Sequence, residues 1–293
     1  NNHLFTEMSY TRTWQVPGVR NSTASDGNPY GIDTPMLYDV MEIQRLYGAT
    51  VDQNEDNTTY RWNNAPFRET LRDTAGFDTI DASNFGTDQT IDLRPGRMNN
   101  IGENSHSLML THDTRIENAL GGRGNDQITG NELNNLLVGN GGNDILEARG
   151  GSDIMMAGAG NDSYIWRIGD AWDTIDENRS AGRDDIHIHG NHSTLNAPFG
   201  TINDLTEDFL FRRIGRDLRI DFTIDRGEAV GGLTIKDMEW GGSRIETLRI
   251  FGLGGQLGPA INLESIFLQA TDVGQRFRLT ETEHPFGNIA VLA

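Results

Sequence analysis

A repeat with a period of nine residues is the feature that most constrains this chain. It occupies residues 117–164, where an acidic or amide side chain recurs at every ninth position without a slip. These ladder positions are Glu117, Asp126, Asn135, Asp144, Asp153 and Asp162. An apolar or aromatic residue follows each of them two positions later, namely Ala119, Ile128, Leu137, Leu146, Met155 and Tyr164. A strict short period predicts stacked units, each too small to bury its own apolar residue.

Glycines fill most of the positions between the ladder residues. They are Gly121, Gly122, Gly124, Gly139, Gly141, Gly142, Gly150, Gly151, Gly158 and Gly160. Six glycine-rich residues suit a turn and the remaining three suit a short strand, so two nonapeptides should form one coil. Turns eighteen residues apart should then stack, with the apolar positions pointing inward as a thin core.

Stacked acidic side chains repel one another unless a cation lies among them. Carboxylate and backbone carbonyl oxygens are the ligands that calcium prefers, so the pattern predicts several bound calcium ions. The alternative is a flexible linker rich in glycine and asparagine. A linker has no reason to keep an apolar residue at every ninth position, which favours the folded interpretation.

The nonapeptide resembles the repeats-in-toxin motif G-G-x-G-x-D-x-U-x, whose fold is a calcium-bound parallel β-roll. Asn135 in place of Asp, and Ala148 and Ala157 in place of Gly, depart from that motif. They put individual ions in doubt rather than the roll. The resemblance implies calcium ligands at Arg115, Glu117, Gly122, Gly124, Asp126, Asn135, Gly139, Gly141, Gly142, Asp144, Gly150, Gly151, Asp153, Gly158, Gly160 and Asp162.

Charge and composition exclude several classes of function. Asp and Glu total 43 against 24 Lys and Arg, and a formal charge of −19 disfavours binding to nucleic acid or anionic membrane. The chain has no cysteine, so calcium would take the place of disulfide bonds in stabilising a secreted protein. No apolar run approaches the roughly 20 residues that span a bilayer. There is no signal peptide and Asn1 is not an initiator methionine, so we expect a processed, cut or partial chain.

The first 48 residues predict one helix and carry a second resemblance. Thr34 can cap a helix over residues 35–47, and Gly48 would end it. Met8-Ser9-Tyr10, followed by residues 43–49, resembles the end of the catalytic domain of the serralysins, which are secreted zinc metalloproteases of the metzincin class. The resemblance implies that Met8 is the structural Met-turn residue and that Tyr10 supports the zinc and the oxyanion. It divides the chain into residues 1–48, the end of a catalytic domain, and residues 49–293, a β-roll and β-sandwich domain.

The helix that defines this protease class is missing from the sequence. Its motif H-E-x-x-H-x-x-G-x-x-H occurs nowhere, and none of the seven histidines forms the required pair. A catalytic zinc needs about three protein ligands. We therefore expect this chain alone to lack peptidase activity, with zinc bound only together with an upstream catalytic segment.

Two acidic loops lie between the predicted helix and the repeats. Residues 54–63 and residues 73–81 resemble a pair of calcium loops that follow the catalytic domain in serralysins. The resemblance implies one ion surrounded by oxygens of Asn54, Asp56, Thr58, Asp73, Ala75, Gly76 and Asp78. Without the resemblance, both loops read equally well as solvated turns.

Beyond the repeats the sequence predicts more strands. After the repeats, residues 165–168, 184–189, 209–212, 218–222, 233–236 and 245–250 alternate in polarity, which favours a β-sandwich continuing the roll. Before the repeats, residues 89–93 and 107–110 also alternate like strands. His187 and His189 lie on one strand face with His192 just beyond, so they are either transition-metal ligands or an ordinary strand face. Residues 261–268 predict a short helix, and the hydrophobic tail at 288–293 suits either a type I secretion signal or an edge strand.

The sequence therefore predicts a mainly β fold, in which a calcium-bound parallel β-roll merges into a β-sandwich behind an N-terminal remnant of a metzincin catalytic domain. Its expected role is that of the post-catalytic part of a secreted, extracellular serralysin-like metalloendopeptidase. The expected partners are the upstream segment, protein substrates and the type I secretion machinery, with no nucleic acid and no membrane insertion. The alternative is a non-enzymatic extracellular calcium-roll protein, such as an adhesin or a degenerate protease. The sequence upstream of Asn1 would distinguish the protease hypothesis from the non-enzymatic one.

Overall fold

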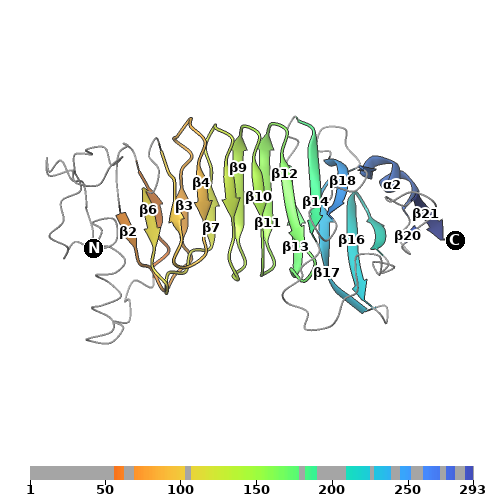
Figure 1. The fold of residues 1–293 in the computed structure, drawn as a ribbon, viewed down its shortest axis with the longest axis horizontal. Helices are drawn as coiled ribbons and strands as arrows, with labels where there is room; N and C mark the ends of the chain where they lie inside the picture. The colour runs from red at the N-terminus through yellow and green to blue at the C-terminus, as the bar shows by residue number, and fades with distance from the viewer. Residues whose placement is uncertain are drawn as a thin grey trace, which may run out of the picture. The chain divides into compact units, whose positions relative to one another are not determined.

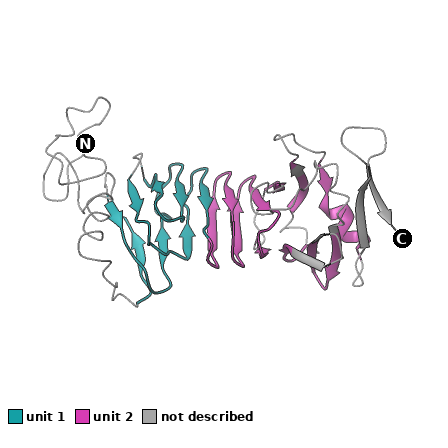
Figure 2. Ribbon diagram, turned by 60° about the horizontal axis from the view of Figure 1, so that its bottom comes forward, with its two compact units in different colours: residues 1–131 teal, residues 132–293 magenta. Residues whose placement is uncertain are grey.

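The structure, a computed structural model, describes residues 56–62, 69–102, 107–177, 182–189, 209–224, 228–238, 245–251, 260–270, 275–280 and 288–292. The Met-turn, the predicted helix over 35–47, the 48/49 boundary and Asn54 lie outside these residues. The chain divides into two compact units, residues 1–131 and residues 132–293 (Figure 2). The described parts of both units are mainly β, as the sequence predicts.

Unit 1 contains short, mostly parallel strands. Its strands are β1 (Thr59–Arg61), β2 (Glu69–Leu71), β3 (Thr79–Asp81), β4 (Thr90–Asp92), β5 (Met98–Asn99), β6 (Leu108–Leu110), β7 (Asn118–Leu120) and β8 (Gln127–Thr129). The parallel pairs are β1–β3, β3–β7, β4–β8 and β2–β6, whereas β5 runs antiparallel to β6. Registered partners such as Ile80 and Ala119 are both fully buried, so the core is one side chain per strand wide.

Unit 2 begins with the eighteen-residue coil that the repeat predicts. One sheet contains β9 (Leu136–Gly141), β11 (Ile154–Ala159) and β13 (Trp172–Ile175), and the other contains β10 (Ile145–Glu147), β12 (Ser163–Arg167) and β14 (Asp184–His189) (Figure 1). Leu136 pairs with Ile154, and Ile145 pairs with Ser163, each eighteen residues on. The inward residues of the repeats, including Leu146, are fully buried. The predicted coil length and core positions are confirmed.

The rest of unit 2 closes these two sheets as a sandwich. β13 is followed across its sheet by β17 (Glu228–Ile235), β16 (Asp217–Ile224), β15 (Phe209–Ile214), β20 (Gln275–Thr280) and β21 (Asn288–Leu292). β14 is followed by β18 (Ile245–Phe251) and β19 (Ile261–Asn262). Buried Trp166 of β12 meets Phe222 of β16 edge to face, with ring centroids 6.3 Å apart, so side chains of the two sheets share one core.

Two predicted features near the C-terminus are present. The helix α2 (Leu263–Gln269) begins after Asn262, whose side chain accepts the Ser265 N–H at 2.7 Å. The strand β21 comes last in the order of its sheet, which agrees with the edge-strand interpretation of the tail. Its role in secretion stays a prediction. Among the described residues, no helix has the length and apolar character needed to cross a bilayer.

Candidate metal centre

Two ladder carboxylates of the repeats are each fixed by a backbone N–H of the preceding coil. Asp153 Oδ1 accepts the Asn135 N–H at 2.6 Å, and Asp162 Oδ1 accepts the Asp144 N–H at 2.7 Å. Asp153 and Asp162 each contribute two groups to a ladder. The side chain accepts an N–H of the preceding coil, and the backbone N–H of the same residue donates to the next carboxylate along the ladder. These bonds place the acidic side chains inside the turns, where the sequence predicts them.

The ladders continue beyond the last nonapeptide. Asp173 Oδ1 accepts the Asp153 N–H at 2.9 Å, and Asp184 Oδ1 accepts the Asp162 N–H at 2.9 Å. Glu246 then accepts the Asp184 N–H at 2.8 Å. Sequence reasoning missed these three residues because the intervals are 20, 22 and 62 instead of eighteen. Their signal is an acidic residue two positions before a buried apolar one, as in Asp173-Thr174-Ile175.

Unit 1 repeats this arrangement around the two acidic loops. Asp78 Oδ1 accepts the Thr58 N–H at 2.8 Å, and Glu117 in turn accepts the Asp78 N–H at 2.8 Å. A Cβ on Gly76 would lie 2.6 Å from the Asp56 carbonyl oxygen and 3.1 Å from Asp78 Oδ1, so both loops meet there. The same loops hold Asp73, whose Oδ1 accepts the Ala75 N–H at 3.3 Å and whose Oδ2 accepts the Tyr60 hydroxyl at 2.5 Å. The structure thus brings together the described members of the predicted loop site.

Four of the ladder carboxylates keep one oxygen without a hydrogen-bond donor. Asp78, Asp153, Asp162 and Asp173 are all buried, and in each the Oδ2 atom has no partner within the described part of the chain. None of the basic side chains that the structure describes forms an ion pair with them. A buried carboxylate normally has a paired charge or a metal. The orphaned oxygens therefore indicate positions for a cation.

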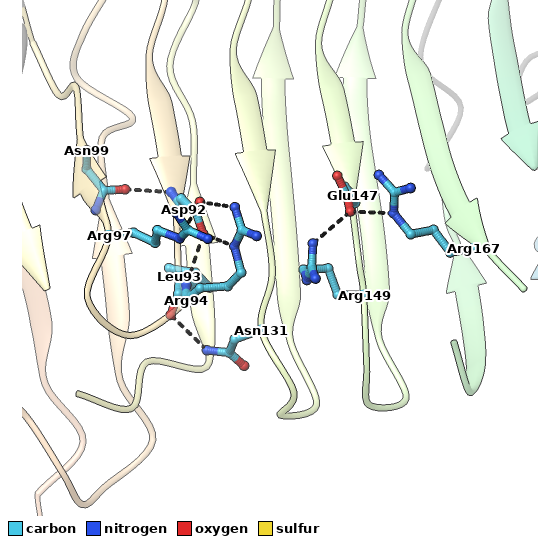
Figure 3. Close-up of polar contacts among 9 residues, drawn as sticks. All are labelled: Asp92, Leu93, Arg94, Arg97, Asn99, Asn131, Glu147, Arg149 and Arg167. Atoms are coloured by element: carbon cyan, nitrogen blue, oxygen red, sulfur yellow. Dashed lines mark hydrogen bonds and ion pairs between the residues drawn. The ribbon is translucent and has the colours of Figure 1, made fainter. Parts of the chain in front are cut away.

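Arginines neutralise other carboxylates instead. In unit 2, Glu147 Oε1 accepts Arg167 Nε at 2.8 Å and Arg149 Nη1 at 3.1 Å (Figure 3). In unit 1, Arg94 Nη2 lies 2.5 Å from Asp92 Oδ2 (Figure 3). The basic side chains in the described ranges thus pair with other carboxylates and not with the four buried ladder aspartates.

Burial makes the ladder carboxylates hard to ionise without a counter-charge. Loss of solvation raises the pKa of Asp78 and of Asp162 to about 6, and neighbouring carboxylates add to both shifts. Burial also raises the pKa of Asp153, with the Asp170 carboxylate adding to the shift, and burial raises the pKa of Asp173, with the Asp153 carboxylate adding to it. A divalent cation would remove this repulsion and hold the groups ionised.

Steric crowding in the turns leaves no room for a side chain at several glycine positions. A Cβ on Gly139 would lie 2.2 Å from Asp144 Oδ2 and 2.6 Å from the Ala157 carbonyl oxygen. A Cβ on Gly160, at φ +149°, would lie 1.6 Å from the Gly142 carbonyl oxygen. Carbonyl and carboxylate oxygens therefore crowd the same turns, and no cysteine competes for a metal. These residues fit a hard, oxygen-preferring cation, which in proteins is most often calcium.

The histidine pair is an ordinary strand face in this structure. His189 stacks on Phe251 with ring centroids 4.3 Å apart, and His187 meets the same ring edge to face at 5.0 Å. Within the described ranges, no group of three metal-ligating side chains includes either histidine. His192 lies outside the described residues.

Stacked glycine turns that carry buried carboxylate ladders define this fold as a parallel β-roll with acidic turns. The model of the family described as peptidase M10 serralysin C terminal matches residues 39–233. The chain therefore belongs to the serralysin C-terminal family.

Several curated serralysins are similar to this chain. Serralysin C of Dickeya chrysanthemi is 30% identical over 139 residues, which cover 43% of this chain and 29% of that protein. The serralysin of Photorhabdus laumondii is 33% identical over 141 residues, covering 44% of this chain and 28% of the relative. The serralysin of Proteus mirabilis is 34% identical over 141 residues, covering 44% and 27%. The matched part of the chain spans less than a third of the length of these relatives.

Proposed function

We propose that this chain is the calcium-binding, post-catalytic part of a secreted serralysin-like zinc metalloendopeptidase. Membership of the serralysin C-terminal family supports the protease context. The observation that carries the calcium assignment is the set of buried ladder aspartates with an oxygen that no described donor or cation satisfies. Calcium at these turns supplies the missing positive charge.

The ligands follow from the ladders and the glycine turns. In unit 2 the ladder side chains from Asn135 to Asp162, extended by Asp173 and Asp184, would bind calcium together with glycine carbonyls. In unit 1 the corresponding group is Asp56, Thr58, Asp73, Ala75, Gly76 and Asp78, beside Glu117. These residues hold their own positions through backbone hydrogen bonds, so each turn is preorganised for an ion.

The proposed role is folding controlled by calcium. An ion that binds only the folded chain stabilises it by about 2.7 kcal/mol at a free concentration 100 times its dissociation constant. Several such ions would make folding depend on the calcium level. The chain would stay unfolded in a low-calcium cytosol for type I export, with its C-terminal segment as the signal, and would fold outside the cell.

Peptide hydrolysis belongs to the whole protease in this proposal. An upstream segment with the three-histidine helix would bind the zinc. Met8 and Tyr10 would join it as the Met-turn residue and as a supporting ligand, and protein substrates would bind there. The described part of the chain would act on this centre only through stability.

Calcium removal tests the proposal on the 293-residue chain. Far-UV circular dichroism and thermal melting would be recorded at pH 7.5 in a calcium chelator, in excess calcium and in magnesium alone. We expect the strand signal and the cooperative melt to require calcium, with poor substitution by magnesium because it demands a tight octahedral site. An unchanged melting temperature in the chelator contradicts the proposal.

A further inference from the structure

The end of β9 carries an asparagine where the equivalent positions of the neighbouring coils carry glycine. Gly122 and Gly158 lie eighteen residues before and after Asn140. Asn140 is exposed and has a φ of +77°, and its registered partner Gly158 has a φ of +98°. Asparagine tolerates this left-handed backbone better than most residues other than glycine. Asn140 is also followed by Gly141, and no other asparagine in the sequence precedes a glycine.

An asparagine before a glycine can lose its side-chain amide without an enzyme. The Gly141 backbone nitrogen attacks Asn140 Cγ and gives up its proton, the bond from Cγ to the amide nitrogen breaks, and ammonia leaves. Water then opens the five-membered imide ring. Opening at Cγ gives aspartate, whereas opening at the main-chain carbonyl gives isoaspartate, in which the chain continues through the former side-chain carbonyl. Glycine favours the attack because it has no side chain beside the nitrogen.

The folded coil holds the backbone of both residues in place. In the parallel ladder of β9 and β11, Asn140 pairs with Gly158 and Gly141 pairs with Ala159. The Gly142 N–H donates to the Ala159 carbonyl oxygen at 2.9 Å. The two strands approach closely here, because a Cβ on Gly158 would lie 2.4 Å from the Asn140 carbonyl oxygen. Ring closure requires the backbone between the two residues to rotate, so the reaction has to wait until the ladder opens.

We propose that Asn140 is a spontaneous modification site, which the folded roll protects and the unfolded chain exposes to deamidation. The calcium dependence of the protection rests on the proposed function, since calcium would keep the roll folded. The isoaspartate product adds one carbon atom to the main chain within a repeat. Because β9 and β11 stack through residues that stay eighteen apart, this product would disrupt their register. A chain kept without calcium would therefore slowly lose its capacity to fold.

Peptide mapping by mass spectrometry tests the site on the full chain. Samples would be incubated at neutral pH in excess calcium, in a chelator, and in a chelator with urea. We expect conversion of Asn140 in calcium to be at least about tenfold slower than in urea, because the reaction requires local opening of the ladder. Conversion in the chelator alone should approach the rate in urea. Asn143, which precedes Asp144 in the same turn, is the internal control and should convert more slowly than Asn140 in urea.

Refolding measures the consequence of the modification. Each chelator sample would be returned to calcium, and the recovered strand signal would be recorded by far-UV circular dichroism. Asn140→Gly is the matched variant, because glycine accepts the same φ and stands at the equivalent position of the next coil, but it has no amide. We expect the wild type to recover less strand signal as the incubation lengthens, and Asn140→Gly to recover more than the wild type.

The outcomes separate this inference from the proposed function. Equal conversion of Asn140 in calcium and in urea overturns the protected site. Equal loss of refolding in the wild type and in Asn140→Gly overturns the consequence assigned to the modification. Slow conversion in both calcium and chelator, with fast conversion in urea, supports protection by the fold but contradicts folding controlled by calcium.

Discussion

Four buried ladder aspartates, Asp78, Asp153, Asp162 and Asp173, have two separate tasks. One oxygen accepts a backbone N–H of the preceding coil, as Asp153 Oδ1 does from Asn135, and the other oxygen remains for a cation. The first task needs only a hydrogen-bond acceptor, which explains why an asparagine can stand in a ladder. The second needs charge, because neutral ligands bind calcium more weakly.

Comparing two neighbouring ladder positions tests this division. We expect Asp144→Ala to raise the calcium midpoint of folding about tenfold more than Asn135→Ala does, or roughly 1.4 kcal/mol in binding free energy. Asp144 brings a charge and faces Gly139 in a full glycine turn, whereas Asn135 is neutral. Calcium titrations followed by circular dichroism measure both midpoints. Equal midpoints contradict the assignment of charge to the ladder.

The turn glycines provide a second test at the scale of single residues. Gly160→Ala should destabilise the calcium-bound protein by about 2 kcal/mol or more, because the added Cβ would overlap the Gly142 carbonyl oxygen at a φ of +149°. Gly141→Ala is the matched control, since the nearest atom to its Cβ would lie 3.9 Å away. Urea unfolding in saturating calcium compares the two variants. Similar losses of unfolding free energy in the two variants would show that steric crowding does not explain the glycine at position 160.

Among the secondary-structure elements, the repeated strands were the easiest to predict. A nine-residue period fixes which residue points inward, so fully buried Leu137 and Met155 could be identified without a structure. Asp173 and Asp184 were not predicted as ladder residues because extra residues between the coils break the nine-residue period. Each still precedes a buried isoleucine by two positions.

The alternation within one strand predicts a large difference between adjacent residues. In β10, Leu146 is fully buried whereas Ile145 is 40% exposed. Leu146→Ala should cost about 2–5 kcal/mol of unfolding free energy, because it leaves a cavity in a core one side chain wide. Ile145→Ala should cost less than about 1 kcal/mol. Chemical denaturation in saturating calcium measures both, and equal losses would contradict the observed strand orientation.

For the whole molecule, net charge and folding are linked through the buried acids. The formal charge of −19 includes several carboxylates that the fold places side by side without described cations. Calcium and protons are the two ways to relieve that repulsion. The stability of the metal-free chain should therefore respond to pH in the direction opposite to ordinary acid denaturation.

The sign follows from the raised pKa values. Burial raises the pKa of Asp78 and Asp162 to about 6 and of Asp184 to about 7, above the ordinary value near 4 for an unfolded aspartate. The folded chain thus binds protons more tightly, so their contribution to stability is complete below about pH 4 and is lost as pH rises through about 6–7. The strand signal of the metal-free protein in far-UV circular dichroism should be larger at pH 5 than at pH 8, and in saturating calcium the protein should be at least as stable at pH 8 as at pH 5. A metal-free chain that is more stable at pH 8 contradicts the raised pKa values.

The central claim, that calcium in the carboxylate ladders folds the roll, is tested most directly at the ladder amides themselves. The backbone N–H groups of Asn135, Asp144, Asp153 and Asp162 donate to the next carboxylate of each ladder. Hydrogen–deuterium exchange of these amides would be measured at neutral pH in calcium and in a chelator. The account predicts slow exchange in calcium and exchange near the unfolded rate in the chelator. Equal protection in both conditions would show that the ladders are stable without a metal and would contradict the claim.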